Sequence, residues 1–303
     1  MHPKVSICIP THNRKDYLRQ AIDSALAQTY GYCEIVVVDD GSTDGTKEMM
    51  DAVGSGVRYH WMDHGGQSAA RNKLIDLARG RFITFLDSDD LLFPGAVQSL
   101  VNAMDTHGPD VFVYGSYVGM DENGSYTQRK RRKLPSGMIA TELFDFIHVH
   151  TCGTLCAKRL YEEFGGFDIS LRRCAAYKLL LDISLKYEFV GLDEVLYARR
   201  RHSGNRFDHS CADRKIELEV LEDFYYNRGG KDIIREHRAM KRFGQEAYRA
   251  GRCAIREGRY EEARQLLRDS FRRYPNVKSA AGWFRAALGR LKAVCRPSQT
   301  RSS

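Results

Sequence analysis

The chain has 303 residues, of which 43% are hydrophobic and 28% charged, a composition that is ordinary for a folded globular protein and excludes wholesale disorder. No apolar run reaches about 18 residues, so the sequence predicts no transmembrane helix, and its first residues lack the apolar stretch of a signal peptide. The eight cysteines are scattered, unlike those of a disulfide-rich secreted domain. We therefore expect a cytoplasmic protein of about two domains with reduced thiols.

The positive charge of the chain is concentrated near its C-terminal end. Residues 238–303 contain 17 lysines and arginines but 5 aspartates and glutamates, a surplus of 12 against a net charge of +8 for the whole chain. Such a segment fits contact with an anionic membrane surface, or equally a well-solvated helical surface. Nucleic acid is the other anionic partner to consider. The sequence has no zinc-finger, homeodomain or RNA-recognition motif, so we expect no nucleic-acid binding.

The first 120 residues alternate apolar, β-branched runs with segments of helical periodicity. Strands are predicted at 5–9, 34–38, 57–61 and 81–86, and helices at 16–28, from Thr43, at 65–78 and near Pro94. This alternation predicts an α/β fold, with a mostly parallel central sheet flanked by helices in a Rossmann-like arrangement. Ligands of such sheets bind beyond the carboxyl ends of the strands, so functional residues are expected directly after each strand.

After about Asn205 the strand patterns disappear. Helices are predicted at 213–227 and 231–250, and residues 254–274 resemble one tetratricopeptide-like helical hairpin. One copy does not make a repeat array, which needs about three units to bury a continuous core. We therefore predict a first domain at 1–205 and a basic α-helical accessory region at 206–303.

One acidic cluster follows the second predicted strand. Asp39 and Asp40 precede Gly-Ser-Thr-Asp-Gly, a stretch that is also typical of a turn that caps the next helix. The turn interpretation explains Asp44 better than it explains Asp39 and Asp40. A calcium loop is a poorer match, because a strand instead of a helix precedes the cluster.

A second acidic cluster, Asp87-Ser88-Asp89-Asp90, follows the fourth predicted strand. Alternate residues of an extended chain point to the same side, so Asp87 and Asp89 share a face. Two adjacent carboxylates repel each other unless a cation neutralises them, and Mg²⁺ or Mn²⁺ binds through one or two carboxylates together with substrate phosphates. The alternative is that these acids only favour the N-terminus of the helix near Pro94.

Four segments of the chain occur in a recognisable order: Val-Ser-Ile-Cys-Ile-Pro-Thr-His-Asn-Arg at 5–14, Val-Val-Asp-Asp-Gly-Ser-Thr-Asp-Gly-Thr at 37–46, Gly-Gln-Ser-Ala-Ala-Arg-Asn at 66–72 and Phe-Leu-Asp-Ser-Asp-Asp at 85–90. With them the chain resembles the family 2 inverting glycosyltransferases with a type A nucleotide-sugar-binding fold over about residues 4–205. Four motifs in register are far more specific than any one of them.

The resemblance implies transfer of a sugar, with inversion, from a nucleotide diphosphate sugar that is often UDP-linked. The implied donor-binding residues are Pro10, Thr11, Asn13, Asp39, Asp40, Arg71, Asp87 and Ser88, with Asp40 at the base edge and Asp87 toward the ribose. Asp89 and His202 would bind Mn²⁺ or Mg²⁺, which neutralises the leaving diphosphate. Two alternatives stay open: a surface salt bridge for Arg71 and a structural role for His202.

The family pattern breaks at its third acidic site. Members carry a Glu-Asp pair after a Gly-Gly-Phe-Asp segment, and one of these acids is the general base that deprotonates the acceptor hydroxyl. Here Phe-Gly-Gly-Phe-Asp is intact at 164–168, but Ala175 and Ala176 replace the pair and the usual later acid is Lys178. General-base catalysis contributes about 10²–10⁴-fold, so we expect donor binding with severely reduced transfer. Asp168 and Asp182 are the candidates for a substitute base.

Two functional hypotheses follow from this break. The first is a metal-dependent glycosyltransferase scaffold that lacks its base, whose glycan or lipid-linked acceptor belongs to the cell envelope at the inner membrane face. The second is a nucleotide-sugar-binding pseudoenzyme that acts as an interaction or regulatory partner. A separate zinc site of His148, His150, Cys152 and Cys156 is a weaker alternative, because their spacing fits no standard structural zinc site.

Overall fold

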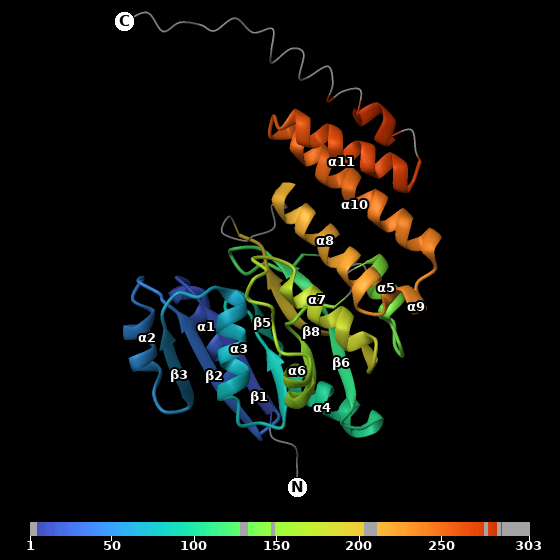
Figure 1. The fold of residues 1–303 in the computed structure, drawn as a ribbon. Coiled ribbons are helices and arrows are strands. Elements are labelled where there is room, and N and C mark those ends of the chain that lie inside the picture. Colours follow the sequence, from blue (N-terminus) through green and yellow to red (C-terminus); the bar gives the residue numbers. More distant parts are fainter. Residues whose placement is uncertain are drawn as a thin grey trace, which may run out of the picture. The chain divides into compact units, whose positions relative to one another are not determined.

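The computed structural model describes residues 5–127, 133–146, 149–202, 211–275, 278–283 and 286. The chain divides into two compact units, Met1–Asn205 and Arg206–Ser303. The described part of the first unit is an eight-stranded sheet with helices on both faces, and that of the second unit contains helices without strands (Figure 1). The predicted α/β fold and helical C-terminal region are confirmed.

The elements of the first unit alternate along the chain as the sequence predicts up to β4, and the short strand β5, which was not predicted, comes between β4 and α4. The strands are β1 (Val5–Thr11), β2 (Cys33–Asp40), β3 (Val57–Met62), β4 (Phe82–Phe85), β5 (Leu91–Leu92), β6 (Val111–Met120), β7 (Thr154–Ala157) and β8 (Glu188–Arg200). The helices are α1 (Lys15–Leu26), α2 (Thr46–Val53), α3 (Gln67–Leu77), α4 (Ala96–His107), α5 (Ala140–Asp145), α6 (Lys158–Glu163) and α7 (Ala175–Ser184).

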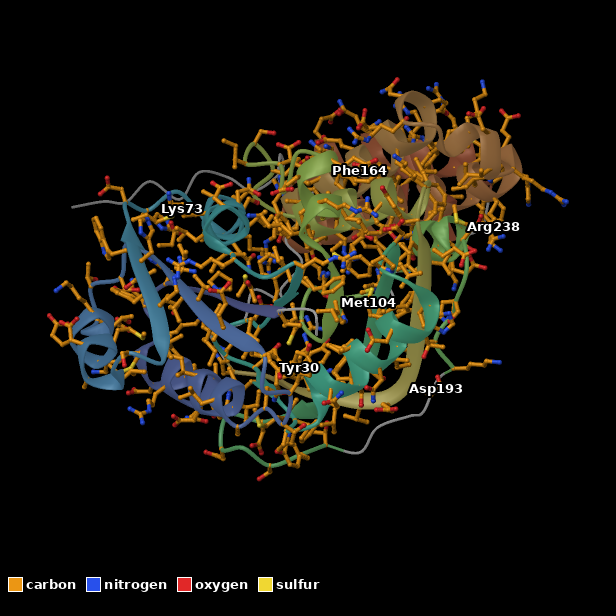
Figure 2. The ribbon with its side chains drawn as sticks, turned by 90° about the horizontal axis from the view of Figure 1, so that it is seen from below. Tyr30, Lys73, Met104, Phe164, Asp193 and Arg238 are labelled. Atoms are coloured by element: carbon orange, nitrogen blue, oxygen red, sulfur yellow. The ribbon has the colours of Figure 1, made fainter. Side chains whose placement is uncertain are left out.

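The first four strands are parallel and bring their carboxyl ends to one edge of the sheet. Their order is β3-β2-β1-β4, and the last residue of β1, Thr11, pairs with Asp39 of β2. From β1 through β2 to β3 the chain adds each new strand on one side of β1, and it then crosses back to place β4 on the other side of β1. Because both kinds of crossover are right-handed, α3, which connects β3 to β4, lies on the opposite face of the sheet from α1. Figure 2 shows α3 with Lys73 on one side of the sheet and α4 with Met104 on the other.

The second half of the sheet differs from the prediction. The complete order is β3-β2-β1-β4-β7-β6-β8-β5, and β7 is antiparallel to both β4 and β6. β8 is parallel to β6 but antiparallel to the short β5, so the sheet is mixed, with four of seven pairings parallel. The pairing of Leu91 with Ala198 has a direct consequence: it brings the end of β8 beside the turn that contains Asp89.

The second unit is built from α8 (Cys211–Asn227), α9 (Gly230–Ile233), α10 (Glu236–Arg256) and α11 (Tyr260–Arg273). The helix predicted at 231–250 is therefore interrupted before Glu236 and continues to Arg256. α10 and α11 form a hairpin that turns at Gly258, where φ is +74°. Its core consists of Ala250, Cys253, Ala254, Ala263, Leu266, Leu267 and Ala286. None of the described helices is long and apolar enough to cross a membrane.

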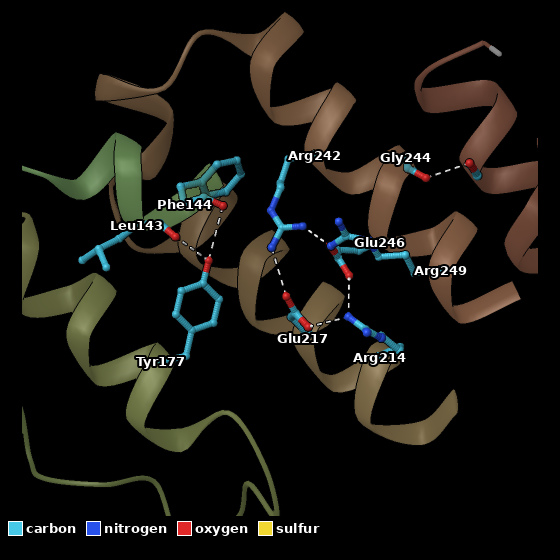
Figure 3. A network of polar contacts seen from close by, with 10 residues as sticks. Leu143, Phe144, Tyr177, Arg214, Glu217, Arg242, Gly244, Glu246 and Arg249 are labelled. Atoms are coloured by element: carbon cyan, nitrogen blue, oxygen red, sulfur yellow. Dashed lines mark hydrogen bonds and ion pairs between the residues drawn. The ribbon is translucent and has the colours of Figure 1, made fainter. Parts of the chain in front are cut away.

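A buried network of ion pairs joins α8 to α10 (Figure 3). The Arg242 guanidinium, 6% exposed, contacts Glu246 and lies 3.0 Å from Glu217. Arg214 lies 3.6 Å from both carboxylates, and Arg249 contacts Glu246 as well. The Glu246 side chain is completely buried, so its charge depends on these arginines for compensation.

This network makes Glu246 a determinant of stability. Glu246→Ala leaves the buried Arg242 without its closest partner, which typically costs about 3–5 kcal/mol of the free energy of unfolding. Urea unfolding of the full chain measures this difference. Glu219→Ala is the matched control, because Glu219 is an exposed residue of α8 and its replacement should change stability by about 0.5 kcal/mol or less. Equal stability of the two variants would contradict the role assigned to the network.

Candidate functional site

The ends of β1 and β2 form the first half of the site. The buried carboxylate of Asp39 accepts hydrogen bonds from the Ser42 amide (2.9 Å) and from the Tyr59 hydroxyl (2.7 Å). The turn interpretation therefore applies to Asp39 as well as to Asp44, whose Oδ1 accepts a bond from the Thr46 hydroxyl at 2.6 Å. These bonds fix Asp39 at the strand end.

Asp40 is held by the loop that precedes α3. Its carboxylate accepts hydrogen bonds from the amides of Gly65 (2.7 Å) and Gly66 (3.0 Å), and His64 Nδ1 lies 2.9 Å from Oδ2. Its side chain is only 4% exposed. The β2, β3 and α3 segments therefore meet at this carboxylate.

The loop after β1 is tied to the loop after β2. Asn13 has a left-handed backbone conformation (φ +50°), which asparagine tolerates better than most residues. Its amide donates to the Ser42 hydroxyl at 2.8 Å, and its side-chain oxygen accepts from the Thr43 amide at 2.8 Å. Pro10 and Thr11, just before it, are buried at the end of β1. Pro10, Thr11, Asn13, Asp39 and Asp40 are thus gathered as one group at adjoining strand ends.

Arg71 and Asp87 form an ion pair beyond β4, in which the arginine is buried and the Asp87 side chain is 30% exposed. Arg71 Nη2 donates to Asp87 Oδ1 at 2.7 Å and to the Thr151 hydroxyl at 3.1 Å, and the arginine is 6% exposed. Burial raises the pKa of Asp87, but the charge and hydrogen bond of Arg71, together with the charges of Arg199 and Arg14, bring the pKa below its usual value. The expected alternative of a surface salt bridge does not describe Arg71. Ser88, the next residue after Asp87, is buried.

Asp89 and His202 come together from strands that are distant in the sequence. His202 Nε2 lies 3.1 Å from Asp89 Oδ2, with both side chains less than 10% exposed. The Arg14 guanidinium contacts the same carboxylate oxygen. One carboxylate oxygen and one imidazole nitrogen are donors that a divalent first-row metal accepts, so this pair fits such an ion. The ring of Tyr17 covers His202 at a centroid distance of 4.8 Å.

Arg200 holds the turn with Asp89 and Asp90, and sequence analysis missed this contact. Its backbone amide donates to Asp90 Oδ1 at 3.0 Å, and its Nε donates to the Asp89 carbonyl at 3.1 Å. Its Nη2 donates to Gln20 on α1 at 2.7 Å. Burial and the nearby carboxylates of Asp87 and Asp89 raise the pKa of Asp90 well above its ordinary value. Arg200 is one of three consecutive arginines, and only the pairing of β8 with β5 reveals which of them points inward.

The Gly-Gly-Phe-Asp segment is held against α3, beside Arg71. Asn72 makes two bonds to Phe167: its Oδ1 accepts from the Phe167 amide at 2.7 Å and its Nδ2 donates to the Phe167 carbonyl at 2.8 Å. The Arg71 guanidinium lies over the Phe167 ring at 5.4 Å. Gly166 has φ +71°, and a Cβ there would come within 2.5 Å of Asn72 Oδ1, so this approach requires glycine.

Ala175 and Ala176 form the start of α7, directly after Cys174 in a left-handed conformation (φ +63°). The first turn of α7 contains no acidic residue. Tyr177 fixes this end of the helix, because its hydroxyl donates to the Leu143 carbonyl at 2.8 Å (Figure 3). A carboxylate at either alanine position would therefore project from an immobilised turn.

Neither candidate for a substitute base lies in that turn. Asp168 accepts a bond from the Ser170 hydroxyl at 2.6 Å and lies 3.4 Å from Lys178 Nζ. The Ser170 bond and the Lys178 charge lower the pKa of Asp168, which makes it a weaker base. Asp182 is buried in the second half of α7.

A second group of candidate metal ligands consists of His12, Asp40 and His64. In the described part of the chain it is the one group of three such side chains whose ligand atoms all lie within 4.8 Å of one another. His150, Cys152 and Cys156 do not form such a group, and His148 lies outside the described residues. Residues 203–205, which follow His202, also lie outside the described residues.

His150 provides a test of the electrostatics beside Asp87. Burial and the nearby Arg199 charge lower the pKa of His150 to about 3, whereas an unfolded histidine titrates near about 6.5. The folded imidazole should therefore stay neutral, and native stability should fall as pH drops below the unfolded value. NMR signals of His150, assigned with His150→Gln, should not shift between pH 8 and pH 5. A midpoint between pH 6 and pH 7 would contradict this environment.

Comparison with known proteins identifies the family. A family model described as "Glycosyl transferase family 2" matches residues 6–164. An uncharacterized glycosyltransferase of Rickettsia typhi is 34% identical over 227 residues, which cover 73% of this chain and 69% of that protein. An uncharacterized glycosyltransferase of Rickettsia felis is 32% identical over 226 residues, which cover 72% of this chain but only 37% of the Rickettsia felis protein.

A solved structure shares the fold. TarS 1-349 of S. aureus in complex with UDP-GlcNAc superposes with a TM-score of 0.60 and 15% identity, over 96% of this chain and 92% of that one. On the family model and the identity with the Rickettsia typhi protein, this chain is a member of glycosyltransferase family 2.

Proposed function

We propose that this chain binds a nucleotide diphosphate sugar, with UDP as the nucleotide, at the ends of β1, β2 and β4. One observation carries the proposal. Arg71, Asp87, Asp89 and His202 converge from α3, the turn after β4 and the end of β8 on one edge of the sheet. The complex of TarS with UDP-GlcNAc, a protein of the same fold, supports this choice of donor.

The first half of the site supplies the groups that a nucleoside needs. The Thr11 hydroxyl is buried and has no hydrogen-bond partner among the described residues. Because a buried polar atom without a partner costs about 1–3 kcal/mol, a ligand that bonds to it gains affinity. The fixed carboxylate of Asp39 and the side chain of Asn13 lie on the same strand ends. We assign the nucleoside to these residues and to Asp40, and the diphosphate to the region of Arg71 and Asp89.

Asp89 and His202 would hold Mn²⁺ or Mg²⁺. When bound, the ion neutralises the negative charge that develops on the leaving diphosphate. Arg14, which contacts the same oxygen of Asp89, adds a second positive charge at this point. Arg200 positions the turn by holding the Asp89 carbonyl and the Asp90 carboxylate.

Transfer also requires a base. The acceptor hydroxyl oxygen attacks the anomeric carbon, the bond from this carbon to the diphosphate oxygen breaks, and a carboxylate takes up the hydroxyl proton. Alanine cannot accept a proton, and the first turn of α7 has no acid. Ala175 and Ala176 therefore leave this step without its base, and transfer is expected to be strongly impaired or absent.

A second function is favoured by the same two alanines. A chain that binds the donor but does not transfer the sugar is suited to act as a regulatory or interaction partner. Turnover distinguishes the two functions, because both require donor binding.

The acceptor of the first function is a glycan or a lipid-linked sugar of the cell envelope. The basic surplus of residues 238–303 supports a place at the cytoplasmic face of an anionic membrane. Binding of the full chain to vesicles with and without anionic lipid distinguishes this location from that of a protein that stays in the cytoplasm.

The turnover prediction concerns the α7 turn. Ala175→Glu/Ala176→Asp restores two carboxylates at the start of α7, and it should raise sugar transfer by about 10²–10⁴-fold. The measurement is Mn²⁺-dependent UDP release from a panel of UDP-sugars with a candidate acceptor. Equal release by the original chain and the double variant would show that the base has been assigned wrongly.

Two controls accompany this experiment. Glu188 is an exposed residue of β8, and Glu188→Gln in the double variant should leave release unchanged. Adding His202→Ala to the double variant should abolish the Mn²⁺ dependence, because it removes one of the two assigned metal ligands.

UDP binding by the original chain, measured by calorimetry, tests the donor assignment without turnover, and absence of binding would refute this assignment.

A further inference from the structure

Two histidines converge on Asp40 from loops that are far apart in the sequence. His12 follows β1 and His64 follows β3, and their rings stack with a centroid distance of 4.4 Å and an interplanar angle of 30°. Their ligand atoms and a carboxylate oxygen of Asp40 all lie within 4.8 Å of one another. Neither histidine belongs to the Asp89–His202 pair.

The hydrogen bonds show which atoms of this cluster face each other. His12 Nδ1 lies 2.7 Å from the Asp40 carbonyl oxygen, and His64 Nδ1 lies 3.1 Å from the same oxygen. His64 Nδ1 is also 2.9 Å from Asp40 Oδ2. Both imidazole Nδ1 atoms therefore face the Asp40 carbonyl oxygen, and the Asp40 carboxylate lies beside them.

The backbone holds this arrangement in place. Gly41 has φ +77°, and a Cβ there would lie 3.0 Å from the His64 amide nitrogen, so the loop with His64 depends on glycine to approach β2. The amides of Gly65 and Gly66 fix the orientation of the Asp40 carboxylate. The His64 side chain is 57% exposed, which leaves the cluster accessible to an ion from solvent.

This donor set is typical of zinc. Zn²⁺ takes imidazole nitrogen at about 2.0–2.1 Å and carboxylate oxygen at about 2.0–2.2 Å in a tetrahedron, so its ligand atoms lie roughly 3.3 Å apart. Ligand atoms within 4.8 Å of one another reach this spacing by small side-chain movements. Mg²⁺ and Mn²⁺ prefer oxygen ligands, so two imidazoles distinguish this site from one for the ion of the transfer reaction.

We propose that His12, Asp40 and His64 bind Zn²⁺. To coordinate through Nδ1, each imidazole gives up its Nδ1–H hydrogen bond to the Asp40 carbonyl and moves the proton to Nε2. Asn13 Nδ2, which lies 3.1 Å from His12 Nε2, then has to turn away. A consequence, which rests on the proposed function, is that zinc and the nucleotide exclude each other, because Asp40 and the neighbouring Asn13 are assigned to the nucleoside. Zinc bound here thus inhibits donor binding.

The test is a calorimetric titration of the chelator-treated full chain with ZnCl₂. We expect His64→Ala to weaken zinc binding by about tenfold or more, as loss of a ligand or of its support does. His107→Ala is the matched control, because His107 is an exposed histidine at the end of α4 and its replacement should leave binding unchanged. Since His64 is largely exposed, His64→Ala should retain the thermal unfolding temperature of the original chain.

Three results would overturn the assignment. They are no zinc binding at all, equal zinc affinity of His64→Ala and the original chain, and loss of binding in His202→Ala but not in His64→Ala. The last result would place the ion at Asp89 and His202. As a spectroscopic check, Co²⁺ bound in place of Zn²⁺ should give visible absorption bands that His64→Ala removes.

A titration with UDP separates this inference from the proposed function. In the original chain, saturating Zn²⁺ should weaken UDP binding by about tenfold or more. In His64→Ala, the UDP affinity should be the same with and without Zn²⁺. If UDP binds equally well with the zinc site filled, zinc and nucleotide do not overlap and the inferred inhibition is wrong. If UDP does not bind even without zinc, the proposed function fails, while the zinc titration alone decides the metal site.

Discussion

The site depends on compensation of the negative charge that Asp87, Asp89 and Asp90 concentrate in one turn after β4. Close carboxylates in a buried turn repel each other and disfavour their own charge, as the raised pKa of Asp90 reflects. The compensation comes from three separate segments: the charges of Arg14 after β1 and Arg71 on α3, and the backbone amide of Arg200 at the end of β8. Folding therefore has to assemble both halves of the sheet before this turn is stable.

The site has two sides, and they differ in whether the carboxylates that the proposed reaction needs are present. On the donor side, each carboxylate of the cluster faces a cationic or hydrogen-bonding partner. On the acceptor side, Asn72 fixes the segment around Phe167 with hydrogen bonds and Tyr177 fixes the start of α7, but the first turn of that helix has no carboxylate. Under the proposed function, the scaffold that would position a base is thus present without the base, and this contrast favours donor binding over transfer.

Sequence reasoning predicted the strand-end positions of Asp39, Asp40, Asp87 and Asp89, because each follows an apolar run whose direction in a parallel sheet is determined. It missed β5 to β8, whose pairings, three antiparallel and one parallel, depend on contacts between distant segments and on strands interrupted by glycine and charge. The inward orientation of Arg200 and the approach of His64 to Asp40 were missed for the same reason. Local periodicity contains no information on which distant loops meet.

The central claim, a complete donor site at the strand ends, is tested most directly by a crystal structure of the chain grown with UDP and Mn²⁺. The account predicts an anomalous manganese peak bound by Asp89 and His202, with the diphosphate on the ion and the uracil beside Asp39 and Asn13. It also predicts that Arg14 yields its place on Asp89 to the ion. Nucleotide bound elsewhere, or Asp89 still paired with Arg14 and without manganese, would contradict the account.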